Sequence, residues 1–102
     1  MERYTVRIEL HDADEKDYER LHEEMDALGF VRTIENKSGT TFHLPPAEYS
    51  YRGVEDIDTV LTLAKAAAGT VRPLLTPAVL VTQVKNRKFS GLAKVTATPT
   101  RR

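Results

Sequence analysis

The stretch "RYTVRIEL" at residues 3–10 alternates between two kinds of side chain. The apolar ones point to one side of an extended chain: Tyr4, Val6, Ile8 and Leu10. The polar ones point to the other side: Arg3, Thr5, Arg7 and Glu9. A period of two with one apolar side predicts a β-strand that buries one face and leaves the other open.

The next residues, 11–30, change period and predict a helix. In "HDADEKDYERLHEEMDALGF" the apolar residues fall at i, i+3, i+7 and i+10: Tyr18, Leu21, Met25 and Leu28. That spacing places them on one face of an α-helix. Asp12 or Asp14 can cap its start, and Gly29 ends it.

A β-hairpin is predicted for residues 30–51, "FVRTIENKSGTTFHLPPAEYSY", with its turn at Ser38-Gly39. Pro45-Pro46 ends its second strand, because proline has no N–H to donate to a sheet ladder. Residues 54–69 then have helical spacing and end at Gly69. Two further strands are predicted, the second of them optional: "AVLVTQV" at residues 78–84 and "FSGLAKV" at residues 89–95.

This order of elements predicts an α+β fold, the ferredoxin-like βαββαβ two-layer sandwich. Both helices would cover one face of an antiparallel sheet, with the first strand between the third and the fourth. We expect a single domain over residues 1–96, with an optional extra C-terminal strand, and a flexible tail over residues 97–102. The second face of the sheet stays open unless another segment covers it.

Composition excludes several classes of function. The chain has no cysteine, which rules out disulfides, thiolate metal sites and a cysteine nucleophile. It has no P-loop and no glycine-rich dinucleotide motif, so no cofactor is predicted. No metal is predicted either, because helix capping accounts for Asp12 and Asp14, and because His22 with Asp26 supplies two ligands only. Neither a signal peptide nor a membrane span is recognisable, which favours a cytoplasmic protein without a membrane partner.

Charge is distributed unevenly, although the net charge is zero. Residues 1–36 hold eleven acidic and five basic residues, a net of −6, and residues 37–102 hold four and ten, a net of +6. A basic second half is compatible with a face that binds phosphate. Two copies pairing an acidic helix with a basic strand would explain the asymmetry equally well.

The open face offers a candidate catalytic pair, Arg7 and His43. In the expected fold the strand of residues 41–44 lies beside the first strand and turns His43 outward, next to Arg7. A histidine can act as general base or acid for attack by an RNA 2′-hydroxyl, and an arginine can stabilise the charged phosphorane, without a metal. The alternative is an exposed polar pair without function.

Candidate RNA-binding residues surround that pair: Arg3, Arg32, Tyr49, Tyr51, Arg52, Lys85, Arg87 and Lys88. The tyrosines could stack on an unpaired base, and the cations could hold phosphates. The alternatives are tyrosines that close a small core and ordinary surface cations.

The aliphatic strand of residues 78–84 supports a different hypothesis. Either register leaves aliphatic side chains such as Leu80 and Val84 on the open face, and such a strip is usually covered. The cover would be residues 89–95 or a second copy of the protein, as in a homodimer. A non-catalytic interaction module that dimerises or binds a partner through this face is therefore the alternative function.

Three blocks of this chain resemble the small GhoS-type antitoxins of type V toxin–antitoxin systems: "TVRIELH", "DYERLHEEMDALGFVRTI" and, after a glycine turn, "LPPAEYSY". The resemblance covers residues 3–95. It implies a ferredoxin-like fold and an endoribonuclease that cleaves the single-stranded messenger of a small membrane toxin. An RNA-binding protein without nuclease activity is a third possibility, and it predicts salt-sensitive binding without products.

Overall fold

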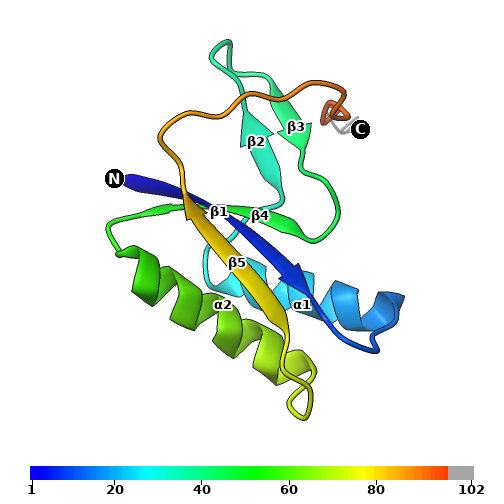
Figure 1. The fold of residues 1–102 in the computed structure, drawn as a ribbon. Coiled ribbons are helices and arrows are strands. Elements are labelled where there is room, and N and C mark those ends of the chain that lie inside the picture. The colour runs from blue at the N-terminus through cyan, green and yellow to red at the C-terminus, as the bar shows by residue number, and fades with distance from the viewer. Residues whose placement is uncertain (97–102) are drawn as a thin grey trace.

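A three-stranded antiparallel sheet forms the centre of the molecule (Figure 1). In the computed structural model, which describes residues 1–96, β1 (Glu2–Glu9) lies between β4 (Glu48–Gly53) and β5 (Ala78–Gln83). The flexible tail expected over residues 97–102 lies outside the described residues. The alternation of the first strand is confirmed, because its apolar side chains are buried: Tyr4, Val6 and Ile8.

Two helices pack on one face of this sheet, α1 (Glu15–Ala27) and α2 (Ile57–Val71). Asp14, one of the two predicted caps, is the N-cap of α1. Its carboxylate accepts a hydrogen bond from the N–H of Asp17 at 2.9 Å. The predicted end of α2 at Gly69 is wrong, since the helix continues to Val71. Val71 is buried in the core, and this anchor outweighs the low helix propensity of one glycine.

The core lies between the helices and the sheet. Leu21 and Met25 of α1 and Val60 of α2 meet the apolar side of β1 there, all of them buried. Tyr49 of β4 is also fully buried, and Tyr51 packs against the same cluster. Burial of about 0.8 kcal/mol per methylene makes this the main source of stability.

The predicted hairpin forms, but as a separate two-stranded sheet. It consists of β2 (Thr33–Glu35) and β3 (Thr41–His43), joined by a turn in which the Asn36 N–H donates to the Thr40 carbonyl at 2.9 Å. Only a bridge between Val31 and Ser50 connects this part of the chain to β4 within the described residues.

The predicted neighbour of the first strand is therefore wrong. Residues 41–44 do not lie beside β1; β4, which follows the two prolines, takes that place. The physical reason is burial, since Tyr49 and Tyr51 fill the core from alternate positions of β4, whereas β3 offers only Phe42 within its three residues. The chain is thus an α+β protein with two helices and antiparallel strands, while its strand order differs from the predicted one.

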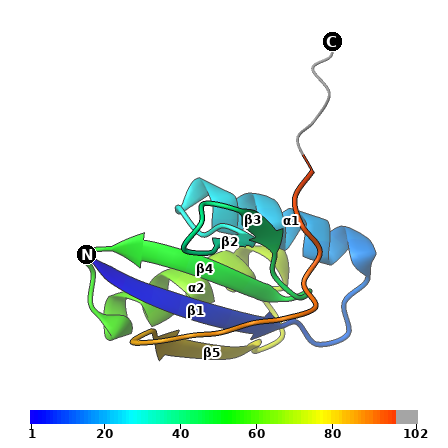
Figure 2. The same cartoon turned by 90° about the horizontal axis from the view of Figure 1, so that it is seen from above.

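The segment after β5 crosses the open face of the sheet and reaches the hairpin, as Figure 2 shows in orange. The Val84 N–H donates to the Arg3 carbonyl at 2.8 Å, and Lys94 forms a bridge with Phe42 of β3. The optional C-terminal strand is thus reduced to one bridge. Residues 84–95 supply part of the cover that the open face was expected to have.

Candidate nucleic-acid interface

The open face of the sheet carries the side chains that β1, β4 and β5 turn away from the helices. Residues paired directly across an antiparallel sheet point to the same side. Arg3 faces Arg52, Thr5 faces both Ser50 and Thr82, and Arg7 faces both Glu48 and Leu80. The face therefore has three cross-strand rows: two arginines at one end, three hydroxyls in the middle, and a mixed row at the other end.

Three arginines gather at the first end, and we call Arg3, Arg52 and Arg87 the arginine cluster. Arg3 and Arg52 lie directly opposite each other and are exposed. Arg87 comes from the crossing segment and donates from Nη1 to the Thr5 hydroxyl at 3.0 Å and from Nη2 to the Ser50 hydroxyl at 3.5 Å. These contacts place the Arg87 guanidinium on the hydroxyl row beside the two opposed arginines.

No ion pair neutralises the charge of the arginine cluster in the part of the chain that the structure describes. Within residues 1–96, no carboxylate forms an ion pair with any of the three guanidinium groups. Burial lowers the pKa of Arg87, and the charge of Arg3 lowers it further. Like charges held opposite each other destabilise a sheet, so an arrangement of this kind is suited to an anionic ligand.

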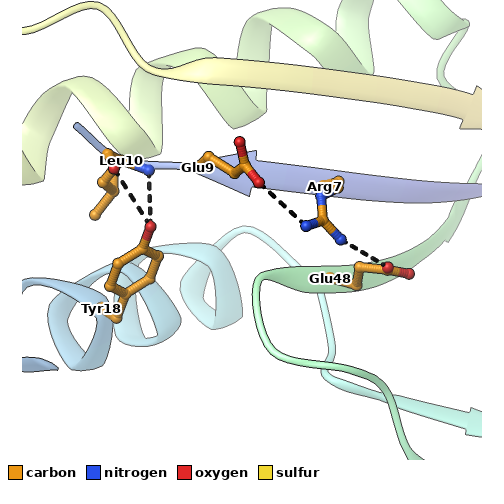
Figure 3. A network of polar contacts seen from close by, with 5 residues as sticks. All are labelled: Arg7, Glu9, Leu10, Tyr18 and Glu48. Atoms are coloured by element: carbon orange, nitrogen blue, oxygen red, sulfur yellow. Dashed lines mark hydrogen bonds and ion pairs between the residues drawn. The ribbon is translucent and has the colours of Figure 1, made fainter. Parts of the chain in front are cut away.

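Arg7, at the opposite end, is in a different electrostatic environment. Its Nη2 donates to Glu9 at 3.1 Å and its Nη1 to Glu48 at 3.2 Å, as Figure 3 shows. The hydrogen bond and the charge of Glu9, followed by those of Glu48, raise the pKa of Arg7. Two carboxylates on one guanidinium leave this end without excess positive charge.

The expected pairing of Arg7 with His43 is wrong. His43 lies in β3 and pairs with Thr33, whereas both neighbours of β1 are other strands. The His43 side chain is exposed, and its backbone N–H donates to the Ala93 carbonyl at 2.8 Å. The two residues therefore belong to different sheets, and the convergence on which the catalytic hypothesis depended is absent from the described structure.

The two tyrosines face the helices and not the open face. The Tyr49 hydroxyl lies 2.6 Å from His22 Nδ1, and burial raises the pKa of Tyr49 to about 12. Tyr51 packs on Phe30 with ring centroids 4.6 Å apart and donates to Glu55 at 2.7 Å. Their positions match the alternative interpretation, tyrosines that complete a small core.

The other candidate cations lie around the edges of the molecule. Arg32 follows Val31 at the edge of β4. Its charge adds to the effect of burial in lowering the pKa of His22, and it partly opposes the rise that burial causes in the pKa of Tyr49. Lys88 lines a cleft above Thr5 together with Arg87, and Lys85 is exposed just after β5. Of the eight predicted RNA-binding residues, register and contacts thus bring together Arg3, Arg52 and Arg87.

His22, which the sequence suggested only as one of two possible metal ligands, is partly buried on α1. Burial first, and then the charge of Arg32, lower its pKa. Its Nδ1 contact satisfies the hydroxyl of a fully buried tyrosine. The signal in the sequence was indirect: a tyrosine predicted inside a core needs a polar partner within reach.

No metal-binding arrangement of three or more His, Asp or Glu occurs among residues 1–96. No helix in the same part of the chain is long and apolar enough to cross a membrane. Comparison of the chain with protein-family models, curated proteins and solved structures gives no match.

Proposed function

We propose that this protein binds single-stranded RNA on the open face of its sheet, with the arginine cluster holding the phosphates. The observation that carries the proposal is the convergence of Arg3, Arg52 and Arg87 without carboxylate partners. Guanidinium groups match phosphate oxygens by bidentate hydrogen bonds. Open sheet faces are a common platform for unpaired RNA strands, and the GhoS-type resemblance of the sequence points to the same class of ligand.

The test is binding of a labelled single-stranded RNA by fluorescence anisotropy, between about 50 and about 200 mM salt. Arg52→Ala should weaken binding to every RNA sequence and reduce the slope of log affinity against log salt by about 1. Lys65→Ala is the matched control, because Lys65 is an exposed cation on α2, in the other layer. Equal effects of the two substitutions would contradict the proposal.

A second candidate function is cleavage of the bound RNA, as implied by the resemblance to GhoS-type endoribonucleases that act on a toxin messenger. The observation that favours it is the contact of His22 Nδ1 with the Tyr49 hydroxyl at 2.6 Å, close enough to Arg32 for its charge to act on both groups. A histidine oriented by a second group is the usual arrangement of a general base. This group lies on the helix side of the sheet, so RNA bound on the open face would reach it over the edge of β4, where Val31 pairs with Ser50.

The chemistry would require no metal. When the Nδ1–H of His22 donates to the Tyr49 oxygen, Nε2 can take the proton of an RNA 2′-hydroxyl. The 2′-oxygen then attacks phosphorus, the bond to the 5′-oxygen breaks, and the leaving oxygen takes a proton from water. Arg32 would stabilise the negative charge of the phosphorane.

The cleavage test compares three proteins on a mixed RNA pool with and without chelator. His22→Asn retains a polar partner for the Tyr49 hydroxyl but cannot transfer a proton, so it should stop cleavage without unfolding the protein. The His43→Ala, Arg7→Ala double variant should still cut. Loss of cleavage in the double variant alone would restore the pair predicted from the sequence.

One observation supports the alternative function, a non-catalytic interaction module. Leu80 is 63% exposed on the open face, in the same cross-strand row as Arg7. A dimer in solution that Leu80→Lys dissociates would favour it, and a monomer at all concentrations would exclude dimerisation. For the fold, we propose a ferredoxin-like variant. The Val31–Ser50 bridge takes the place of the second strand of the βαββαβ order at the edge of β4, and the β2–β3 hairpin is an insertion.

A further inference from the structure

A groove of ≈ 450 Å³ lies between the turn of the β2–β3 hairpin and the segment that crosses the open face. Its lining combines two aromatic rings with cations and an amide: Phe42, Phe89, Lys37, Arg87, Lys88 and Asn36. No acidic residue lines it. Arg87 belongs both to this groove and to the arginine cluster, so the two are continuous.

The aromatic pair has a geometry that leaves a ring available. Phe42 and Phe89 meet edge to face, with centroids 5.0 Å apart and an interplanar angle of 65°. Phe89 remains 36% exposed. The aromatic pair is not the sole contact that holds the crossing segment on the hairpin. A backbone hydrogen bond holds it as well, because the Val95 N–H donates to the Thr41 carbonyl at 2.9 Å.

Asn36 supplies an amide of fixed orientation beside these rings. Its Oδ1 accepts the N–H groups of Ser38 at 3.0 Å and of Thr40 at 2.9 Å. Two donors on one oxygen fix the orientation of the amide and leave Nδ2 to donate elsewhere. A ring face, a hydrogen-bond donor and flanking cations are what an unpaired nucleobase and its phosphate require.

We propose that this groove holds one unpaired nucleobase, stacked on Phe89, of an RNA strand whose neighbouring phosphates lie on the arginine cluster. This inference rests on the proposed function and adds recognition of a base to recognition of the backbone. Lys37 and Lys88 hold the phosphates on either side of the base, and Arg87 connects the groove to the cluster.

The first test uses the unchanged protein and two ligands of about eight nucleotides, oligouridylate and the same ribose–phosphate chain without bases. Oligouridylate should bind about tenfold more tightly than the abasic chain, at an equal salt slope. Equal affinities would overturn the groove as a base site. If both bind equally and Arg52→Ala still weakens both, the proposed function stands and this inference fails; if neither binds, both fail.

The second test places a reporter in the groove. The chain contains no tryptophan, so Phe89→Trp creates a single fluorophore that keeps an aromatic ring at this position. Oligouridylate should quench it and the abasic chain should not. Leu74→Trp is the control, because Leu74 is 95% exposed between α2 and β5 and should not respond. Equal quenching at both positions, or by both ligands, would contradict stacking.

A third variant separates the ring from its packing role. Phe89→Leu keeps an apolar anchor for the crossing segment but removes the π face. Affinity for oligouridylate should fall to that of the abasic chain, a loss of about tenfold, with no change for the abasic chain itself. A loss for both ligands would show that Phe89 only holds the segment in place, and would overturn the proposal.

Discussion

The two ends of the open face carry the same residue in opposite electrostatic states. Arg7 and Arg3 are on the same strand and point to the same side. Arg7 is held between Glu9 and Glu48. Arg3 faces another arginine, Arg52, and a third cation reaches it from the crossing segment.

We infer from this difference that the cross-strand partner of a basic residue decides whether its charge is available to a ligand. A guanidinium paired with two carboxylates is held in one position, but its positive charge is offset and attracts an anionic ligand only weakly. Opposed arginines cost stability in the free protein, and a bound anion offsets that cost.

Removing both opposed arginines should weaken RNA binding most. The Arg3→Ala, Arg52→Ala double variant loses two phosphate contacts, so the affinity at physiological salt should fall about 100-fold and the salt slope by about 2. Anisotropy titrations at several salt concentrations measure both. Arg7→Ala is the comparison on the same face and should cause a much smaller loss, because Arg7 contributes no unpaired cation. An equal loss on removing Arg7 would show that the two ends do not differ.

Freeing Arg7 should turn the neutral end into a second cationic end. The Glu9→Gln, Glu48→Gln double variant removes both carboxylates while keeping the size of the side chains. One additional unpaired cation should raise RNA affinity up to about tenfold and increase the salt slope by about 1. The Glu19→Gln, Glu23→Gln double variant on α1 makes the same change in net charge and serves as the control. Unchanged affinity in the first variant would mean that RNA does not reach this end of the face.

A change in pH should affect folding but not RNA binding at the cluster. Guanidinium groups stay charged throughout the range from about pH 8 to about pH 5.5. Folding lowers the pKa of His22 below its ordinary value of 6.5, so the unfolded chain binds a proton more readily. The stability that neutral His22 contributes is present above pH 6.5 and is lost as the pH falls through the folded pKa. Urea unfolding should show this loss, and His22→Asn should reduce it while affinity stays constant.

The smallest effect concerns the cost of the opposed arginines. Arg52→Thr removes a like-charge pair and introduces a residue that suits strands, so the free energy of unfolding should rise by about 0.5 kcal/mol. Arg7→Thr removes an attraction and should lower the thermal midpoint. Calorimetry at low salt measures both changes. If both substitutions changed stability in the same direction, repulsion at one end and attraction at the other would not explain the difference between the two ends.

Local patterns predicted the local structure well. Period-two alternation identified β1 as a half-buried strand, and the stripe through Leu21 and Met25 identified α1, with Asp14 as one of two candidate caps. These features depend on neighbours within one strand or one helix turn. The end of α2 could not be read from Gly69, because the anchor that extends the helix, Val71, is set by the core.

Long-range pairing is where the sequence was insufficient. The strands of residues 41–43 and 48–53 both alternate, and nothing local states which one pairs with β1. Pairing residues 41–43 with β1 wrongly placed His43 beside Arg7 and left Arg52 at the rim of the open face. The arginine cluster depends on one cross-strand register and on a contact between residues 5 and 87, which no spacing in the sequence encodes.

The position of Arg87 in the chain has a consequence for protein synthesis. All seven described helices and strands are complete at Gln83, before the ribosome adds the segment that crosses the sheet. A chain released at that point would have its core residues in place but only two of the three clustered arginines, and no Phe89. The surface that we propose for RNA is therefore completed only after all seven of these elements have been synthesised, and a translation product interrupted at that point would lack part of it.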